Sequence, residues 1–197
     1  MGDTRQARIQ RRTTETDIDL TFVVDGAGAS SINTGVGFFD HMLAAFSRHG
    51  LFDLTLSCKG DLEVDAHHTV EDVGICLGQA VAEALGDKAG IERFGSAYVP
   101  MDEALARAVI DLSGRSCLVM QAAFRDETVG GLAVALVPEF FRALADNGRM
   151  NVHVDLLRGT NDHHSIEAIF KATGRALDAA TGRSDRVRGV PSTKGTL

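Results

Sequence analysis

The chain has 197 residues, and its 27 aspartate and glutamate residues outnumber its 20 lysine and arginine residues, giving a net charge of −7 at pH 7. This charge argues against nucleic acid as a partner, because binding the phosphate backbone needs a basic face. No apolar run approaches the roughly 20 residues of a membrane span, so we expect no membrane partner. The polar segment at residues 1–17 lacks the apolar core of a secretion signal.

The three cysteines, Cys58, Cys76 and Cys117, are an odd and widely spaced set without a CxxC pair. Such a set favours buried thiols in a reducing compartment over a disulfide framework or a cysteine-ligated zinc site. We therefore expect a cytoplasmic protein.

Apolar patterning predicts a series of strands and helices along the chain. In chain order these are a strand near residues 18–24, a helix over 38–50, strands near 107–112 and 116–124, and a helix over 138–148. The glycine-rich stretch "DGAGASSINTGVG" lacks the third glycine of a dinucleotide-binding fingerprint and is interpreted as a loop. No serine-elbow pattern indicates a nucleophilic triad.

The chain carries the same motif twice, 96 residues apart. "DAHHTVEDVG" occupies residues 65–74 and "NDHHSIEAIF" occupies residues 161–170. A short alternating strand and a glycine-containing turn precede each motif, and an amphipathic helix follows it, with Gly78 and Gly174 at the same offset. We interpret this as an internal duplication of a ββαβ-like unit, with each helix packed on one face of a sheet.

The duplication predicts an α/β (α+β) fold of two pseudo-repeated sheet-plus-helix units in one compact domain. That domain spans residues 1–197, with repeats at about 5–95 and 96–190. The last segment, residues 183–197, has no apolar periodicity and is predicted to be mobile or ordered by a partner.

The HHxxE spacing suits metal binding when it lies on a helix. Each motif supplies two adjacent histidines and a glutamate, namely His67, His68 and Glu71 in the first and His163, His164 and Glu167 in the second. Residues four apart on a helix lie about 40° apart around its axis and can share an ion, whereas neighbours diverge by about 100°. A diverging pair therefore suits two metals, one on each side of the helix.

Two further histidines complete a plausible ligand count. His153 lies on the strand before the second motif and His41 lies in "FFDHML". The eight residues divide into two sites of three histidines and one glutamate, each with open positions for catalysis. Such a mixed shell suits Mn, Fe or Zn. The alternative is a set of exposed, solvated histidines.

Six segments in order resemble the imidazoleglycerol-phosphate dehydratase family. They are "FFDHML", "DAHHTVEDVG", "RFGSAYVPMDEAL", "DLSGR", "NDHHSIEAIFKA" and "PSTKG", and the resemblance runs from about Arg5 to the C-terminus. It implies halves related to the ferredoxin-like arrangement. It also implies a lyase of histidine biosynthesis that converts D-erythro-imidazole glycerol phosphate, a small phosphorylated imidazole, to imidazole acetol phosphate and water.

The resemblance also implies cofactor, ligands and assembly. The cofactor is manganese, with two Mn(II) ions per active site, and the homo-oligomer is a shell of about 24 subunits in which metals bridge neighbours. The implied ligands are His41, His67, His68, Glu71, His153, His163, His164 and Glu167.

Catalytic and phosphate-binding residues follow from the same resemblance. Glu15 is implied as the acid/base, and Glu167 is a second candidate that would act as ligand and base together. The implied phosphate-binding residues are Arg93, Arg115, Lys171, Ser192 and Lys194. The C-terminal segment would then close over bound phosphate and exclude water.

The sequence departs from the family pattern in a few places. Ala45 stands where the family generally carries a glutamine expected to face the substrate, and Ser47 is a possible replacement. Gly37 and Phe39 also replace the usual proline and leucine. These departures bear on substrate affinity and leave every metal-binding position intact.

Two other function classes remain open from sequence. One is a non-catalytic metal-assembled shell or scaffold protein, which would use the same histidines without needing Glu15 or the phosphate-binding set. The other is a dinuclear phosphoester hydrolase, although such sites usually rely on aspartates and a bridging carboxylate.

Overall fold

The first half of the chain forms one sheet and two helices. The computed structural model describes residues 4–197, so the first three residues of the predicted domain and of the polar N-terminal segment lie outside it. The elements are β1 (Gln6–Arg12), β2 (Thr16–Val23), β3 (Ser30–Asn33), α1 (Gly37–Gly50), β4 (Asp53–Gly60) and α2 (His67–Leu85). The sheet order is β1-β2-β4-β3, with only β3 and β4 parallel.

The second half repeats this arrangement. Its elements are β5 (Phe94–Met101), β6 (Ala104–Asp111), β7 (Cys117–Gln121), the short pair β8 (Thr128–Val129) and β9 (Leu132–Ala133), α3 (Leu136–Gly148), β10 (Asn151–Arg158) and α4 (Asp162–Thr181). The sheet order β5-β6-β10-β7, again with one parallel pair at the edge, matches the first half strand for strand. The predicted fold of two pseudo-repeated sheet-plus-helix units is confirmed.

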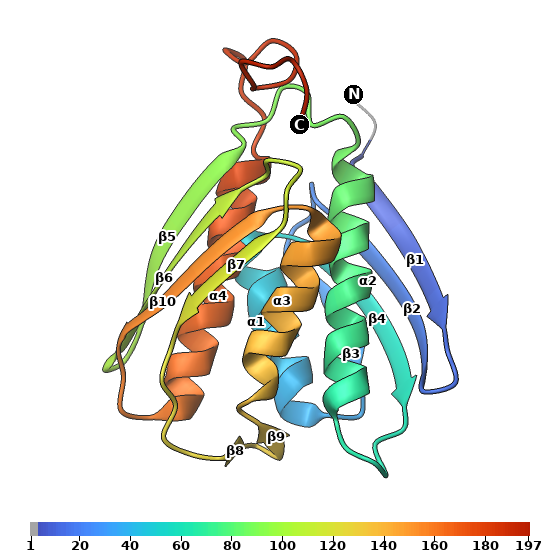
Figure 1. Ribbon diagram of the computed structural model, residues 1–197, viewed down its shortest axis with the longest axis vertical. Helices are drawn as coiled ribbons and strands as arrows, with labels where there is room; N and C mark the ends of the chain where they lie inside the picture. Colours follow the sequence, from blue (N-terminus) through green and yellow to red (C-terminus); the bar gives the residue numbers. More distant parts are fainter. Residues whose placement is uncertain (1–3) are drawn as a thin grey trace.

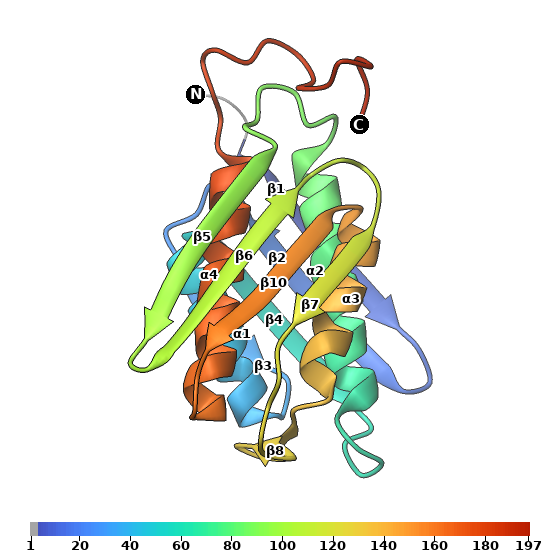
Figure 2. The same ribbon diagram turned by 60° about the vertical axis from the view of Figure 1, so that its left-hand side comes forward.

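The two sheets enclose the four helices between them (Figure 1). Strands alternate accordingly: Ile18, Leu20 and Phe22 of β2 point inward and are buried, while the residues between them are more exposed. Seen from the outside, the second sheet covers the helices with its outer face free (Figure 2). No helix within residues 4–197 is long and apolar enough to span a membrane.

The predicted elements are confirmed, with one correction. Helices predicted over 38–50 and 138–148 are α1 and α3, and both motifs begin helices. The repeat unit, however, is βββαβα, because the stretch interpreted as a loop contains β3. This strand escapes the periodicity rule because it is four residues long and has a single apolar residue, Ile32, which pairs with Leu56 of β4.

Each helix packs mainly against a helix of the other repeat. The second helix of each repeat, α2 or α4, packs against the first helix of the other repeat, α3 or α1. Gly78 makes the α2–α3 approach possible, since a Cβ there would lie 2.7 Å from the Leu144 carbonyl oxygen and 2.7 Å from the Gly148 nitrogen. Gly174 does the same between α4 and α1, where a Cβ would lie 2.4 Å from the Phe46 carbonyl oxygen.

Replacing Gly78 with alanine should therefore destabilise the fold. The clash is with backbone atoms that cannot move alone, and overpacking of this kind outweighs the roughly 1 kcal/mol that alanine adds to helix stability, for a net loss of about 1 kcal/mol or more. Thermal and urea unfolding at fixed protein concentration would measure it. Gly37→Ala is the matched control, because nothing lies within 4 Å of a Cβ at that position. Equal midpoints for the two variants would contradict the close packing.

Candidate metal and substrate site

Both HHxxE motifs start their helices in the same way and at the same end of the molecule (Figure 1). The Asn161 side-chain oxygen accepts hydrogen bonds from the backbone N–H groups of His163 and His164, at 2.9 and 3.3 Å. At the equivalent position of the first repeat, Asp65 accepts from the His67 N–H at 2.7 Å. A polar residue two positions before each histidine pair thus satisfies amide groups that a helix start leaves unpaired.

Adjacent histidines diverge in both motifs, as the helical geometry predicts. The ring centroids of His67 and His68 are 6.1 Å apart with planes at 78°, and those of His163 and His164 are 6.1 Å apart at 81°. Each motif therefore presents its histidines to two separate places.

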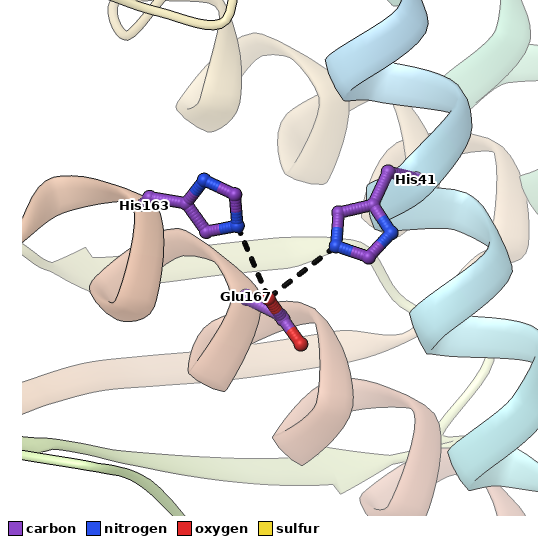
Figure 3. A group of neighbouring side chains, drawn as sticks. All are labelled: His41, His163 and Glu167. Carbon is purple, nitrogen blue, oxygen red and sulfur yellow. Dashed lines mark ion pairs between the residues drawn. The ribbon is translucent and has the colours of Figure 1, made fainter.

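The first histidine of the second motif joins a compact cluster (Figure 3). His41 from α1 places Nε2 3.4 Å from Oε2 of Glu167, and His163 Nε2 lies 3.3 Å from the same oxygen. The donor atoms of these three residues all lie within 4.8 Å of one another, and the part of the chain that the structure describes holds no other such group of three. The two histidines are exposed and the glutamate is buried, so the cluster opens to solvent on the histidine side.

Lys171 completes the surroundings of Glu167. Its Nζ lies 2.5 Å from Oε1, the carboxylate oxygen that does not face the histidines. Burial on its own would raise the pKa of Glu167, but the hydrogen bond from Lys171 and the charges of Lys171 and His41 outweigh it and lower that pKa. Glu167 is therefore held as a carboxylate with one oxygen turned toward two imidazoles.

The second histidine of each motif contacts a carboxylate that sequence reasoning did not assign. Asp61 lies 3.0 Å from Nδ1 of His68, and Glu103 lies 2.8 Å from Nδ1 of His164. A carboxylate on Nδ1 fixes the ring and its tautomer and leaves Nε2 free to bind a metal. Both acids lie in turns after a strand, and only tertiary folding brings them to the histidines, so no local pattern singles them out.

The free Nε2 atoms face further carboxylates. Glu15, in the β1–β2 turn, places Oε1 3.7 Å from Nε2 of His68. Asp102, in the β5–β6 turn, lies 3.8 Å from Nε2 of His164. Glu15 and Asp102 thus approach the second histidine of their repeats from equivalent turns.

The remaining predicted ligands lie apart from these clusters within one chain. His67 Nε2 is 3.9 Å from Oε2 of Glu71, a pair without a third close donor among residues 4–197. His153 is exposed on the outer face of the second sheet, in register with Val109 and Val119 on neighbouring strands. The structure does not bring His153 to either motif of its own chain.

The predicted phosphate-binding residues divide into two places. Lys171 lies beside Glu167, whereas Arg93 pairs with Asp111 at 2.7 Å and donates to the Pro191 carbonyl at 2.9 Å. Arg93 therefore contacts the C-terminal segment that holds Ser192 and Lys194. This segment and the loop between α2 and β5 lie at the end where α2 and α4 finish, opposite the end where these two helices begin (Figure 1).

Comparison with known proteins places the chain in one family. The sequence model described as imidazoleglycerol-phosphate dehydratase matches residues 34–177. The imidazoleglycerol-phosphate dehydratases of Acetivibrio thermocellus and Bacillus subtilis are each 58% identical over 193 residues, which is 98% of this chain and 99% and 100% of theirs. The chain belongs to the imidazoleglycerol-phosphate dehydratase family. It is accordingly an enzyme, a dehydratase of histidine biosynthesis.

Solved structures agree with this assignment. The crystal structure of imidazoleglycerol-phosphate dehydratase from Staphylococcus aureus has a TM-score of 0.82 at 44% identity and covers 91% of this chain and 99% of its own. The Pyrococcus furiosus protein, in complex with (S)-C348, has a TM-score of 0.83 at 39% identity and covers 96% and 100%.

The structure tests Ser47 as the replacement expected for a glutamine at position 45. Ser47 is buried and donates its hydroxyl to the Phe52 carbonyl at 2.6 Å. The Ser47 hydroxyl is thus used at the C-terminal end of α1, and it does not offer a substitute hydrogen bond at this dehydratase's site. Ala45 itself is also buried.

Removing the Glu103 charge should lower the pKa of His164 in the metal-free protein. The hydrogen bond that His164 Nδ1 donates to the Glu103 carboxylate raises that pKa above its ordinary value, so Glu103→Gln should return it toward about 6.5. His68, whose pKa Asp61 raises in the same way, is the internal control and should not move. Titration followed by NMR of the histidine rings would show this, and an unmoved His164 would contradict the assigned contact.

The same contact carries a pH dependence of stability with a defined sign. Because the folded pKa of His164 is raised, the pair stabilises the metal-free fold fully below the unfolded pKa of about 6.5. That contribution is lost as pH rises through the higher folded pKa. Unfolding midpoints measured across this range should therefore fall with pH more steeply in the parent than in Glu103→Gln.

Proposed function

We propose that this dehydratase converts D-erythro-imidazole glycerol phosphate to imidazole acetol phosphate and water, using two Mn(II) ions per active site. The observation that carries the metal dependence is the cluster of His41, His163 and Glu167 at the start of a duplicated HHxxE helix. We place the reaction in the cytoplasm, since three free cysteines, two of them buried, suit a reducing compartment.

The donor set fits a divalent cation with a preference for imidazole and carboxylate ligands. His41, His163 and Glu167 would hold one ion, and His68 and His164 offer Nε2 atoms whose rings are already fixed through Nδ1. Manganese in particular follows from the family resemblance. When bound, the ions supply Lewis acidity that draws electron density into the substrate imidazole.

Glu15 acts as the acid/base that transfers protons during the reaction. The reaction removes a proton from a carbon that bears an alcohol, releases the neighbouring hydroxyl as water, and leaves an enol that tautomerises to the ketone. The proton is not acidic by itself, so a positioned base is needed. The Glu15 carboxylate is about half exposed in an open turn beside His68 and can accept the proton and return one.

Glu167 is the weaker candidate for that role. Lys171 engages one of its oxygens and the other faces His41 and His163, and its pKa is lowered despite burial. A carboxylate so occupied binds and orients, whereas a half-exposed one can shuttle protons. We therefore assign proton transfer to Glu15 and ligation to Glu167.

Phosphate binding requires more than one copy of the chain. Arg93, Arg115, Ser192 and Lys194 supply the cations and the hydroxyl for the phosphate, with Arg offering paired hydrogen bonds. They belong to the end of the molecule opposite the motifs, and α4 alone, with 20 residues, separates the two ends by about 30 Å. A neighbouring subunit would bring the two sets together, which agrees with a homo-oligomer of about 24 subunits.

Metal-stripped protein incubated with imidazole glycerol phosphate, with and without Mn(II), tests the proposal directly. We expect ketone formation only with the metal, together with assembly into a large particle. Assembly without ketone under any divalent metal would favour the scaffold alternative. Release of inorganic phosphate in place of ketone would indicate a phosphoester hydrolase.

A shared site predicts complementation between two inactive variants. Glu167→Gln damages the motif end and Lys194→Ala damages the C-terminal segment, so each alone should lose most activity. Refolded together in equal amounts, they should regain up to about one quarter of the parent activity, because that share of sites would combine two intact halves. Mixing without refolding is the control, and no recovery in the mixed oligomer would show that each site lies within one chain.

A further inference from the structure

We propose that Asp72 is a positioning residue that fixes Glu15 through the side chains of Thr16 and Thr13. This inference rests on the proposed role of Glu15 in proton transfer. Asp72 directly follows the motif glutamate Glu71 on α2, and it is 6% exposed.

Asp72 is held between two strands of the first sheet. Its Oδ1 lies 3.0 Å from an Arg11 guanidinium nitrogen on β1, and its Oδ2 accepts the Thr16 hydroxyl at the start of β2 at 2.5 Å. Thr16 is buried as well. A buried carboxylate paired with a guanidinium and a hydroxyl is costly to leave unmatched, so these partners hold one another in place.

The hydrogen bonds that join the Glu15 turn to the Asp72 carboxylate all run in one direction, toward the carboxylate. Thr16 must donate to Asp72, because a carboxylate only accepts. Thr13 Oγ1 lies 3.3 Å from Thr16 Oγ1 and already accepts the backbone N–H groups of Glu15, at 3.1 Å, and Thr16, at 2.9 Å. With both lone pairs used, Thr13 directs its own proton to Thr16, and the chain runs from Glu15 N–H to Asp72.

The backbone carbonyl of Glu15 is fixed by Asp61, the same residue that contacts His68. The backbone N–H of Asp61 donates to the Glu15 carbonyl at 3.1 Å, while the Asp61 side chain holds His68. Both peptide groups of Glu15 are therefore tied, and the side chain leaves a rigid turn toward His68. Such fixed geometry is what efficient proton transfer requires.

The second repeat lacks this device at the equivalent positions. Ala168 stands at the place of Asp72, four residues after the second histidine, and Ala104 stands at the start of β6 where Thr16 starts β2. The contacts of two equivalent glycines support the match of Thr16 with Ala104. A Cβ on Gly60 would contact Thr69 and Thr16, and a Cβ on Gly159 would contact Ser165 and Ala104. The second repeat thus folds without this polar network, and among residues 4–197 the network lies beside Glu15 alone.

Kinetics of isosteric variants of the assembled, Mn(II)-loaded enzyme test this inference. Thr16→Val removes the hydroxyl, and Asp72→Asn removes the charge and allows the amide to donate in the opposite direction. Each should lower kcat by about 10-fold or more, since small misplacements of a catalytic group have large effects. KM should stay within about twofold, metal content should be unchanged, and Thr16→Ser should restore most of kcat.

The double variant with Glu15→Gln separates positioning from a general structural role. If Asp72 acts through Glu15, Asp72→Asn should cause no further loss in the Glu15→Gln background. Thr181→Val is the matched stability control, because it removes a buried hydroxyl that donates to the Asp178 carbonyl at the far end of α4.

Three results would overturn the inference, and they differ from one another. Unchanged kcat in Thr16→Val or Asp72→Asn would show that the turn needs no support. A full further loss in the Glu15→Gln background would show that Asp72 acts by another route. Full activity of Glu15→Gln alone would instead remove the proposed function of Glu15, while metal-dependent ketone formation could still stand.

Discussion

The packing of helices from one repeat against helices of the other determines where the candidate site forms. Each repeat alone would present helices with one uncovered face, and the glycines at Gly78 and Gly174 let the backbones of the two repeats approach closely enough to cover it. Because α4 packs on α1, His41 of the first repeat meets His163 and Glu167 of the second. The cluster of His41, His163 and Glu167 is therefore a product of the interface between repeats, and neither repeat contains it.

The pseudo-symmetry predicts a second such cluster where α2 packs on α3, but the residue needed to form it has been replaced there. With Gly50 matched to Gly148, the α3 position that corresponds to His41 is Glu139, which pairs with Arg142 at the surface. Among residues 4–197, His67 and Glu71 consequently have no third donor like the one that α1 supplies to the other motif. Under the proposed two-metal function, the missing donors would come from a neighbouring copy, for which the outward-facing His153 is available.

Sequence reasoning predicted the parts of the site that repeat and missed the parts that depend on tertiary folding. The HHxxE helices, their flanking strands and the divergence of adjacent histidines follow from spacing alone. His41 could be suspected from its residue type, but its meeting with His163 depends on helix packing that no local pattern encodes. Asp61, Glu103 and Asp72 carry no local signal, because their partners lie between 7 and 61 residues away along the chain.

Strand β3 and the proposed phosphate-binding residues illustrate two other limits. A four-residue strand with one apolar side chain gives no periodic signal, and only its parallel pairing with β4 makes it a strand. Arg93 and Lys194 carry no local signal of phosphate binding, and in one chain they lie far from the motifs. Family resemblance alone points to them, since their proposed function depends on an assembly larger than the chain.

The two motifs are also unequal in how firmly they are organised. On α4, His163, Glu167 and Lys171 follow one another at intervals of four residues, so they form one stripe in which the lysine fixes one carboxylate oxygen and leaves the other for the histidines. On α2 the residue corresponding to Lys171 is Ile75, and Glu71 is left with one long contact to His67. Lys171 has further donors, one of them near the Met101 sulfur at 3.5 Å, so orienting Glu167 does not exclude a second role toward the phosphate. The α4 motif is thus preorganised by its own helix, whereas the α2 motif depends on what binds beside it.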